Sequence, residues 1–157
     1  MIGRWMAAIL VLGTAAPAMA EVSAMTLRTC AETQIAAGAD PGSCLAEAHA
    51  PCLAEDISAP AVVALCFAEA ERSWGGAIAS LLEEVGTRAP ERLATLARIE
   101  AKYDVLGALV QCDRMQELSQ AMTEESDETV LAQVARCRAT ASALAYVRLV
   151  ARAKALP

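Results

Sequence analysis

Hydrophobic residues recur every three or four positions along three long stretches of the chain, a spacing that is typical of amphipathic helices. We expect the first of these helices to begin after Ser58, which can act as an N-cap, and to end at Gly86. Gly75 and Gly76 in its interior each lower its stability by about 1 kcal/mol relative to alanine. Either a neighbouring helix packs very close to them or the helix kinks. The expected buried face consists of Val63, Phe67, Ala70, Trp74, Ile78, Leu81 and Val85.

The other two long helices are expected on either side of a polar segment, residues 123–127. One opens at Thr87 and Pro90, and the other opens at Ser126, which can cap it. The last helix begins with acidic residues and ends with basic ones, so its charges complement the helix dipole. The helix that opens at Pro90 is expected to bury Leu93, Leu96, Ile99, Tyr103, Leu106, Val110 and Leu118. The last helix is expected to bury Val130, Val134, Cys137, Ala141, Leu144 and Val147.

Two shorter helices precede these three. The first is expected over residues 24–37, and Ser43 caps a second that runs to Ala50 and is broken by Pro51. Short connections join all the helices, and no linker is long enough to separate domains. The pattern therefore predicts an all-α fold, a small antiparallel helical bundle that forms a single domain over residues 21–157.

The composition agrees with a helical bundle. Of the 157 residues, 37 are alanine and only five are aromatic, which favours helices over an all-β fold. The chain is 56% apolar and 20% charged, a balance typical of globular proteins and not of disordered ones. An aromatic-poor core is therefore expected.

Residues 1–20 have the features of a secretory signal peptide. Arg4 precedes an apolar run over residues 6–16, and residues 17–20 end in an A-x-A cleavage pattern. The alternative, an N-terminal membrane anchor, is disfavoured because a run of about eleven residues is far shorter than the roughly twenty that span a bilayer. We therefore expect an exported chain, periplasmic or secreted, with no stable membrane anchor after cleavage following Ala20.

The charge of the expected mature chain limits its partners. Beyond residue 20 there are 12 basic and 19 acidic residues, a net charge of −7. Nucleic acid is not an expected partner, because binding to phosphates depends on clustered lysine and arginine. A cationic protein is a more favourable partner for an acidic exported one.

Six cysteines in an exported chain predict a disulfide framework. A C-x13-C unit occurs twice, and each copy brackets a turn, at residues 38–42 and 56–60. The midpoint of the last two cysteines falls in the polar segment 123–127, where two antiparallel helices are expected to turn back. The predicted disulfides are Cys30 with Cys44, Cys52 with Cys66, and Cys112 with Cys137.

No residue pattern predicts catalysis, cofactor binding or a metal site, so we do not expect an enzyme. The chain has no C-x-x-C, and its single histidine, His49, is expected to be a lone surface residue. The acidic residues 124–128 could bind a cation or a basic partner, but a helix cap with first-turn acids is the favoured interpretation. The basic residues of the last helix could meet an anionic surface, although a solvated face is favoured; they are Arg136, Arg138, Arg148, Arg152 and Lys154.

One family has a similar arrangement of cysteines. Cys30, the segment 44–48 (CLAEA), Cys52 and Cys66, followed by Glu69 and Trp74, resemble the LprI-like family of periplasmic lysozyme inhibitors. Members of that family carry W-D-x-x-L-N-x-x-Y where this chain has WGGAIASLL, residues 74–82. The tryptophan matches and Ile78 is similar, whereas the Asp, Asn and Tyr are absent.

The resemblance extends over residues 30–149, but the later motifs are reduced. The family shows a Q-R-x-W segment and an R-D-x-x-C ending, and this chain has AKYD at 101–104 and LVQC at 109–112. The resemblance implies a proteinaceous inhibitor that occupies the cleft of a cationic lysozyme, with no inhibitory residue that can be carried over.

We therefore expect an exported, non-enzymatic binding protein, a lysozyme inhibitor of LprI-like type. The alternative is a structural or adaptor protein of the cell envelope that buries its alanine-rich faces in self-association. No cofactor is expected for either function.

Overall fold

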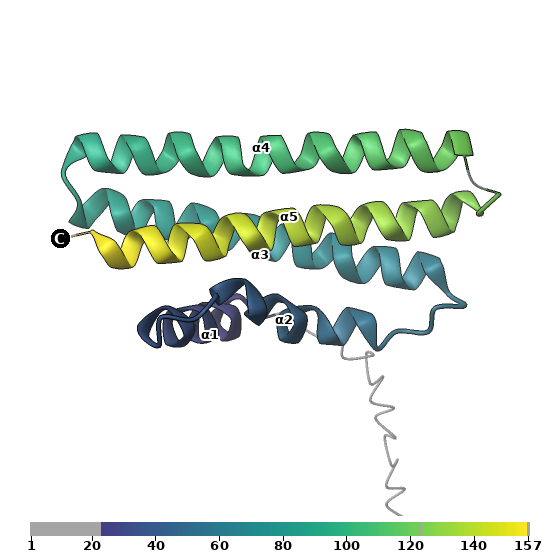
Figure 1. Ribbon diagram of the computed structural model, residues 1–157, viewed down its shortest axis with the longest axis horizontal. Coiled ribbons are helices and arrows are strands. Elements are labelled where there is room, and N and C mark those ends of the chain that lie inside the picture. The colour runs from purple at the N-terminus through teal and green to yellow at the C-terminus, as the bar shows by residue number, and fades with distance from the viewer. Residues whose placement is uncertain (1–22, 123, 157) are drawn as a thin grey trace, which may run out of the picture.

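The computed structural model describes residues 23–122 and 124–156, so the signal peptide expected over residues 1–20 lies outside the described part. Figure 1 shows that the described residues are helical, with no strand among them. The elements are α1 (Ala24–Ala36), one 3-10 turn (Pro41–Ser43), α2 (Cys44–Leu53), α3 (Pro60–Arg88), α4 (Glu91–Met122) and α5 (Asp127–Ala155). The expected all-α bundle with disulfides is confirmed.

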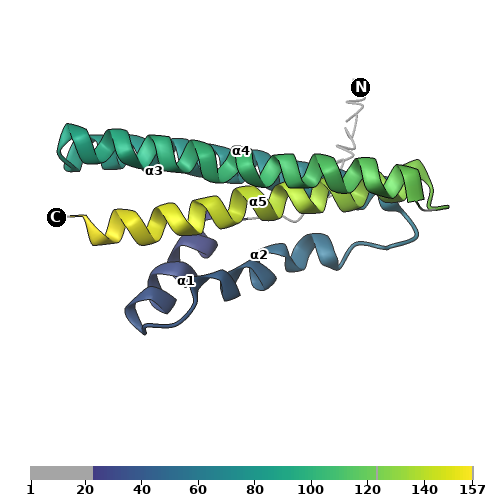
Figure 2. The same ribbon diagram turned by 45° about the horizontal axis from the view of Figure 1, so that its top comes forward.

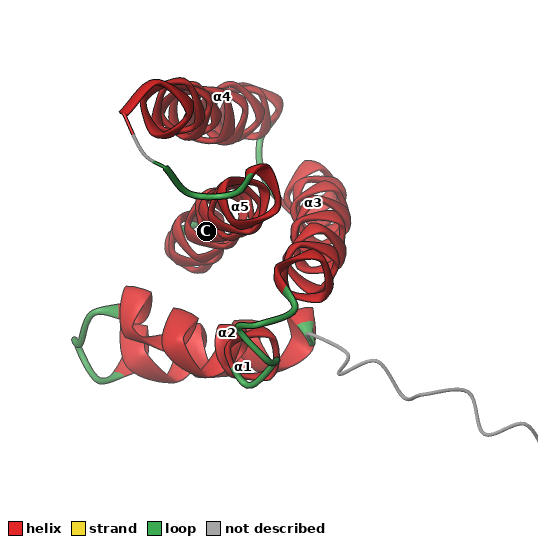
Figure 3. Cartoon of the chain, turned by 90° about the vertical axis from the view of Figure 1, so that its right-hand side faces the viewer, coloured by secondary structure: helices red, strands yellow, loops and turns green. Residues whose placement is uncertain are grey.

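The last helix, α5, lies at the centre of the bundle. Figures 2 and 3 show α5 between the α1–α2 pair and the layer of α3 and α4. Seven of its fourteen buried residues are alanine. Because helices cover it on several sides, its buried surface is wider than the single stripe that the sequence predicts. Within that predicted stripe, Cys137 and Leu144 are only half-buried.

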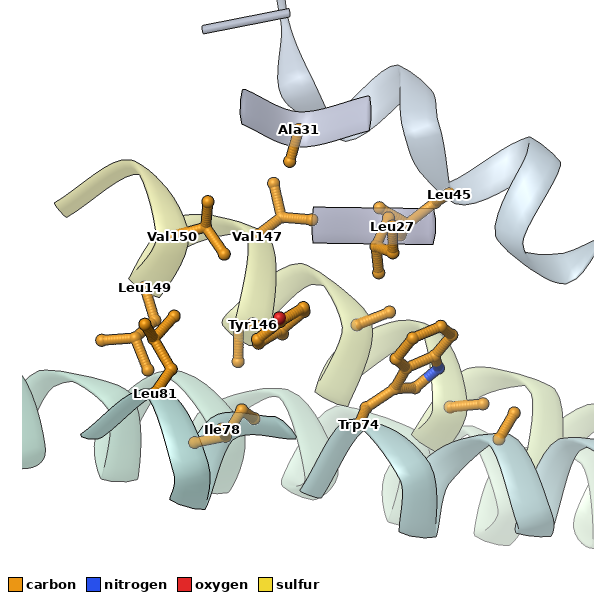
Figure 4. Packing of buried hydrophobic residues seen from close by; sticks show 14 of the residues in the cluster. Leu27, Ala31, Leu45, Trp74, Ile78, Leu81, Tyr146, Val147, Leu149 and Val150 are labelled. Carbon is orange, nitrogen blue, oxygen red and sulfur yellow. The ribbon is translucent and has the colours of Figure 1, made fainter. Parts of the chain in front are cut away.

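The face of α3 that the sequence predicts is buried as expected. From Phe67 to Val85 its residues lie inside the core, and only Val63 at the start is half-buried. Figure 4 shows the Trp74 ring rising from α3 into the core, with Tyr146 of α5 to its left and Leu27 of α1 above. Trp74 is the largest fully buried side chain, so α1, α3 and α5 share one apolar core.

The face of α4 is the opposite of the predicted one. Six of the seven residues expected in the core are exposed, by 46 to 67%, and the seventh, Leu93, is half-buried; the six are Leu96, Ile99, Tyr103, Leu106, Val110 and Leu118. The buried positions are Ala94, Ala97, Ala101 and Cys112.

The close approach of α4 to α5 explains this inversion. The Cα atoms of Cys112 and Cys137 are 5.7 Å apart, which leaves room between the helices for small side chains only. Arg152 of α5 reaches Glu100 of α4 at 2.9 Å, so ion pairs also hold the two helices together. Large side chains on α4 therefore point away from the bundle, and apolar periodicity alone selects the wrong side of the helix.

The ends of α3 also differ from the expected ones. The helix begins at Pro60 without a side-chain cap, because the Ser58 backbone N–H donates to the Asp56 carboxylate at 2.9 Å and Ser58 belongs to a turn. At the other end the helix continues through Gly86 to Arg88. It stops there because Ala89 precedes a proline and adopts the extended backbone that this position favours.

Pro51 does not break α2. The helix runs on to Leu53, since a proline this close to the C-terminal end removes a single helical hydrogen bond. The following residue, Cys52, is buried and bonded to Cys66, which fixes the last turn. Ser43 makes no capping hydrogen bond; Asp40 accepts the Gly42 backbone N–H at 2.9 Å instead.

The three disulfides join Cys30 to Cys44, Cys52 to Cys66, and Cys112 to Cys137, the pairs that the spacing predicts. The first ties α1 to the start of α2, the second ties the end of α2 to α3, and the third ties α4 to α5. Disulfides therefore join α1, α2 and α3 into one group and α4 and α5 into another, in a framework that indicates an oxidising compartment.

Gly75 and Gly76 tolerate side chains. Both are exposed, and a methyl group added to either would have no neighbouring atom within 4 Å. The close helix packing that the sequence allowed at this point is therefore absent. We expect Gly75→Ala and Gly76→Ala each to raise the free energy of unfolding by about 0.5–1 kcal/mol, measured by urea titration.

A contrasting glycine provides the control. Gly38 ends α1 with a φ of 70°, a conformation that penalises any other residue. Gly38→Ala should lower the free energy of unfolding by about 1 kcal/mol. A loss of stability in Gly75→Ala would instead mean that α3 needs a glycine backbone there.

The disulfide pairing has a direct chemical test. In oxidised Cys112→Ala, we expect alkylation in denaturant followed by peptide mapping to label Cys137 alone. The variant should also lose about 3 kcal/mol of stability, because the unfolded chain is no longer constrained by that loop. In the matched variant Cys30→Ala, the label should appear on Cys44. Labelling of Cys66 in either variant would contradict this pairing.

Candidate functional site

An apolar groove of about 200 Å³ lies at one end of the bundle. Figure 1 shows that the loop before α3 and the loop before α5 both lie at this end of the molecule. The groove is formed by the end of α2, the loop over residues 54–59, the start of α3 and the first turns of α5. Its lining residues are Cys52, Leu53, Glu55, Ile57, Pro60, Val63, Phe67, Thr129, Ala132, Gln133 and Arg136.

The loop that forms the rim of this groove is held in place by its own hydrogen bonds. The Asp56 carboxylate accepts the Ser58 backbone N–H, and the Asp56 carbonyl accepts the Ala59 N–H at 2.9 Å. The Cys52–Cys66 disulfide fixes both ends of the loop. The turn leaves Ile57 at its tip with 91% of its surface exposed, the largest exposure among the exposed large apolar residues.

Two acidic residues, Glu55 and Asp56, immediately precede this exposed isoleucine in the loop, and Glu55 also lines the groove. On the opposite wall, Asp127 and Glu128 precede the lining residue Thr129 in the sequence. Hydrogen bonds from Ser58 lower the pKa of the Asp56 carboxyl, so this group remains charged at neutral pH. An apolar tip next to an apolar groove, with carboxylates in the same loop, can contact a surface that combines apolar and cationic groups.

His49 is buried behind Phe67, a lining residue of this groove, and is not the surface residue that the sequence predicts. It is 5% exposed, and its ring meets that of Phe67 edge to face, with centroids 5.5 Å apart. The prediction fails because His49 lies four residues after Leu45 and three before Cys52, on the helical face that α2 buries. Burial lowers the pKa of His49, and the charge of Arg136 lowers it further.

The acidic run before α5 and the basic side chains of α5 make contacts inside the molecule. The Ser126 hydroxyl accepts the Thr129 N–H at 3.3 Å, so the acidic run over 124–128 includes a helix cap, the favoured interpretation. The basic side chains of α5 are not simply a solvated face. Arg138 reaches Asp113 at 2.6 Å, and Lys154 donates to the Glu32 carbonyl at 3.1 Å. These contacts tie α5 to α4 and α1.

Within residues 23–122 and 124–156, no three histidine, cysteine or acidic side chains are placed to hold a metal ion together. No helix in the same ranges combines the length and apolarity needed to cross a bilayer. Ile57 was missed by sequence reasoning. Its signal was an isolated large apolar residue in a turn, between Asp56 and Ser58 and just before Pro60.

Comparisons of the chain with protein-family models, with curated proteins and with solved structures find no match. The LprI-like resemblance therefore rests on the residues quoted above. Of these, the five cysteines form disulfides, and Trp74 is completely buried. The matching tryptophan therefore belongs to the core, where its side chain is inaccessible to a partner.

The buried histidine predicts a pH dependence of stability. Because the folded-state pKa of His49 lies below the unfolded value of about 6.5, the unfolded chain binds this proton first as the pH falls. The free energy of unfolding should therefore decrease below pH 6.5, by up to about 1.4 kcal/mol per pH unit until the folded pKa is reached. Urea titrations between pH 7.5 and 5 measure this slope.

The matched variant is His49→Leu, which keeps an apolar side chain against Phe67. It should show a flatter pH profile than the wild type over the same range, because it lacks the titrating group. Parallel profiles for the two proteins would show that His49 does not cause the dependence.

Proposed function

We propose that this protein is an exported, non-enzymatic binding protein whose partner is a cationic protein, with lysozyme as the first candidate. The observation that carries this proposal is the exposed Ile57, at the rim of an apolar groove and directly after two acidic residues. We call the loop residues 55–57 together with this groove the Ile57 surface. Lysozyme is named because the cysteine arrangement resembles that of LprI-like inhibitors.

Rigidity of the Ile57 surface supports a binding role. The Cys52–Cys66 disulfide and the Asp56 turn hold the loop in one conformation before a partner arrives. A surface that is already ordered loses less conformational entropy on binding, so more of its contact energy appears as affinity. The oxidising compartment indicated by the disulfides is consistent with a periplasmic or secreted protein.

The acidic charge supports a cationic partner. The expected mature chain carries a net charge of −7, and two carboxylates, Glu55 and Asp56, immediately precede Ile57. Charge complementarity of this kind increases the association rate and selects against anionic partners. Arg136, an exposed residue of α5, is the basic residue in the groove lining.

The alternative, an envelope protein that self-associates through its alanine-rich faces, would need a different surface. The alanines of α4, Ala94, Ala97 and Ala101, are buried, and the exposed side chains of this helix are larger. The buried alanines of α5 lie in the same core. The alanine-rich faces of α4 and α5 therefore pack inside the molecule.

The experiment is a titration of the oxidised protein against a panel of lysozymes at moderate salt, following direct binding and cell-wall lysis. We expect saturable inhibition that is lost on reduction. Ile57→Lys should weaken binding about tenfold, because it removes the apolar contact and places a positive charge next to a cationic partner.

Met25→Lys is the matched control, since Met25 is also exposed, by 75%, and lies on α1 outside the groove. It makes the same change in charge and should bind as the wild type does. Absence of binding to every lysozyme would contradict lysozyme as the partner. Equal loss in both variants would mean that net charge, and not the Ile57 surface, determines the affinity.

A further inference from the structure

The outer face of α4 carries a continuous apolar stripe that no part of the described chain covers. It consists of Leu96, Ile99, Tyr103, Leu106 and Val110, which we call the α4 stripe, and each of these residues is between 46 and 67% exposed. Single exposed apolar residues are common, but five on one helical face form a patch of the size that marks interaction sites, roughly a few hundred Å². Figure 3 shows α4 at the outside of the bundle, with α5 and α3 on its inner side only.

The spacing of the α4 stripe is that of a coiled-coil seam. Its residues follow each other at intervals of three, four, three and four, which is the a and d pattern of two heptads. On an amphipathic helix this seam faces the rest of the molecule, but here the alanines occupy that side. The spacing of the stripe is therefore suited to packing against a helix of another molecule.

The two ends of the seam carry opposite charges. Continuing the heptads by one step places Arg92 at the d position before Ile99, and it places Asp113 and Glu117 at the d and a positions after Val110. Asp113 is also ion-paired with Arg138 of α5, at 2.6 Å. If two copies of α4 packed in parallel, Arg92 would lie next to Arg92 and Glu117 next to Glu117. In the antiparallel orientation Arg92 of one copy meets Glu117 of the other, so the face is complementary to itself, as a twofold interface requires.

One antiparallel register brings the apolar positions and the end charges together. If a positions face d positions of the second copy, Tyr103 lies opposite Leu106, and Ile99 lies opposite Val110. The same register places Leu96 opposite Asp113 and Arg92 opposite Glu117 at each end. The apolar layers at the centre are thus bounded at both ends by Arg92 of one copy and the acidic residues of the other.

We propose that the α4 stripe is the interface of an antiparallel homodimer of this protein. A membrane surface fits the face less well, because the expected mature chain carries a net charge of −7 and anionic lipids repel it. The α4 stripe shares no residue with the lining of the groove beside Ile57. The inference therefore does not depend on the proposed lysozyme partner.

Sedimentation velocity of the oxidised protein between about 1 and 200 μM tests the dimer, since an interface of two heptads is small and its dissociation constant is expected in the micromolar range. We expect the weight-average mass to rise from near that of the monomer towards that of the dimer across this range. Leu106→Lys should remain monomeric throughout. Leu65→Lys, on α3, is the matched control, because Leu65 is 51% exposed and outside the stripe, and it should dimerise as the wild type does.

The orientation is tested by charge reversal. Arg92→Glu should weaken dimerisation at least tenfold, and the double variant Arg92→Glu with Glu117→Arg should restore it, because the pairs are re-formed with the charges exchanged. Far-UV circular dichroism and thermal unfolding of each variant confirm that it is folded. Failure of the double variant to restore the dimer would overturn the antiparallel arrangement.

Other outcomes overturn the interface itself. A wild-type protein that stays monomeric at 200 μM contradicts the dimer, and so does a monomer that binds vesicles of anionic lipid through the α4 stripe. A dimer that is unaffected by Leu106→Lys places the interface elsewhere on the molecule. Each of these results can be obtained whether or not the protein inhibits lysozyme.

Discussion

The arrangement of the bundle depends on the small side chains along α5 and on the facing side of α4. Alanine at these positions lets helix backbones approach closely, and the 5.7 Å separation of the Cys112 and Cys137 Cα atoms is the clearest sign of it. Close packing compensates for the scarcity of aromatic residues, because many close contacts between small side chains replace a few contacts between large ones. Trp74 and Tyr146 fill the wider space between α3, α5 and α1.

The same constraint determines what remains on the surface. Since alanine faces inward on α4, its larger apolar residues are left outside, and they form a regular stripe. Ile57 is exposed for a different reason, a turn fixed by Asp56 and a disulfide. The two apolar surfaces are therefore independent in origin and in position. An antiparallel pair of molecules would present two copies of the Ile57 surface, and a target with two sites would bind such a pair with increased avidity.

The sequence predicted the helices and the disulfides well, and their orientation less well. On α3, where large apolar residues from Phe67 to Val85 lie along a single face, they identified the buried face correctly. On α4 the sequence offered two candidate faces, and hydrophobicity favoured the larger side chains although close approach required the smaller ones. Such a choice depends on the neighbouring helix, which a single-helix pattern does not contain.

Local signals failed where tertiary contacts overrode them. Pro51 was expected to end α2, but the helix continues to Leu53, where the buried Cys52 is tied to α3 by its disulfide. His49 is buried because it shares the helical face of Leu45 and Cys52, which packs against the core. Gly86 was expected to end α3, but Pro90 decided the end through the residue before it. The Ile57 surface could not be predicted, because its two walls lie about seventy residues apart in the chain.

The central position of α5 has a consequence for the order in which the molecule can form. A ribosome makes α1, α2, α3 and α4 before the helix on which all of them pack, so the core cannot close until Asp127–Ala155 has been synthesised. Before that, the chain is a series of alanine-rich helices tied only by local contacts. Folding of the core is thus delayed to the end of synthesis. For a chain that is exported, as the sequence predicts, this order leaves the nascent helices without a packed core until the last of them has been made.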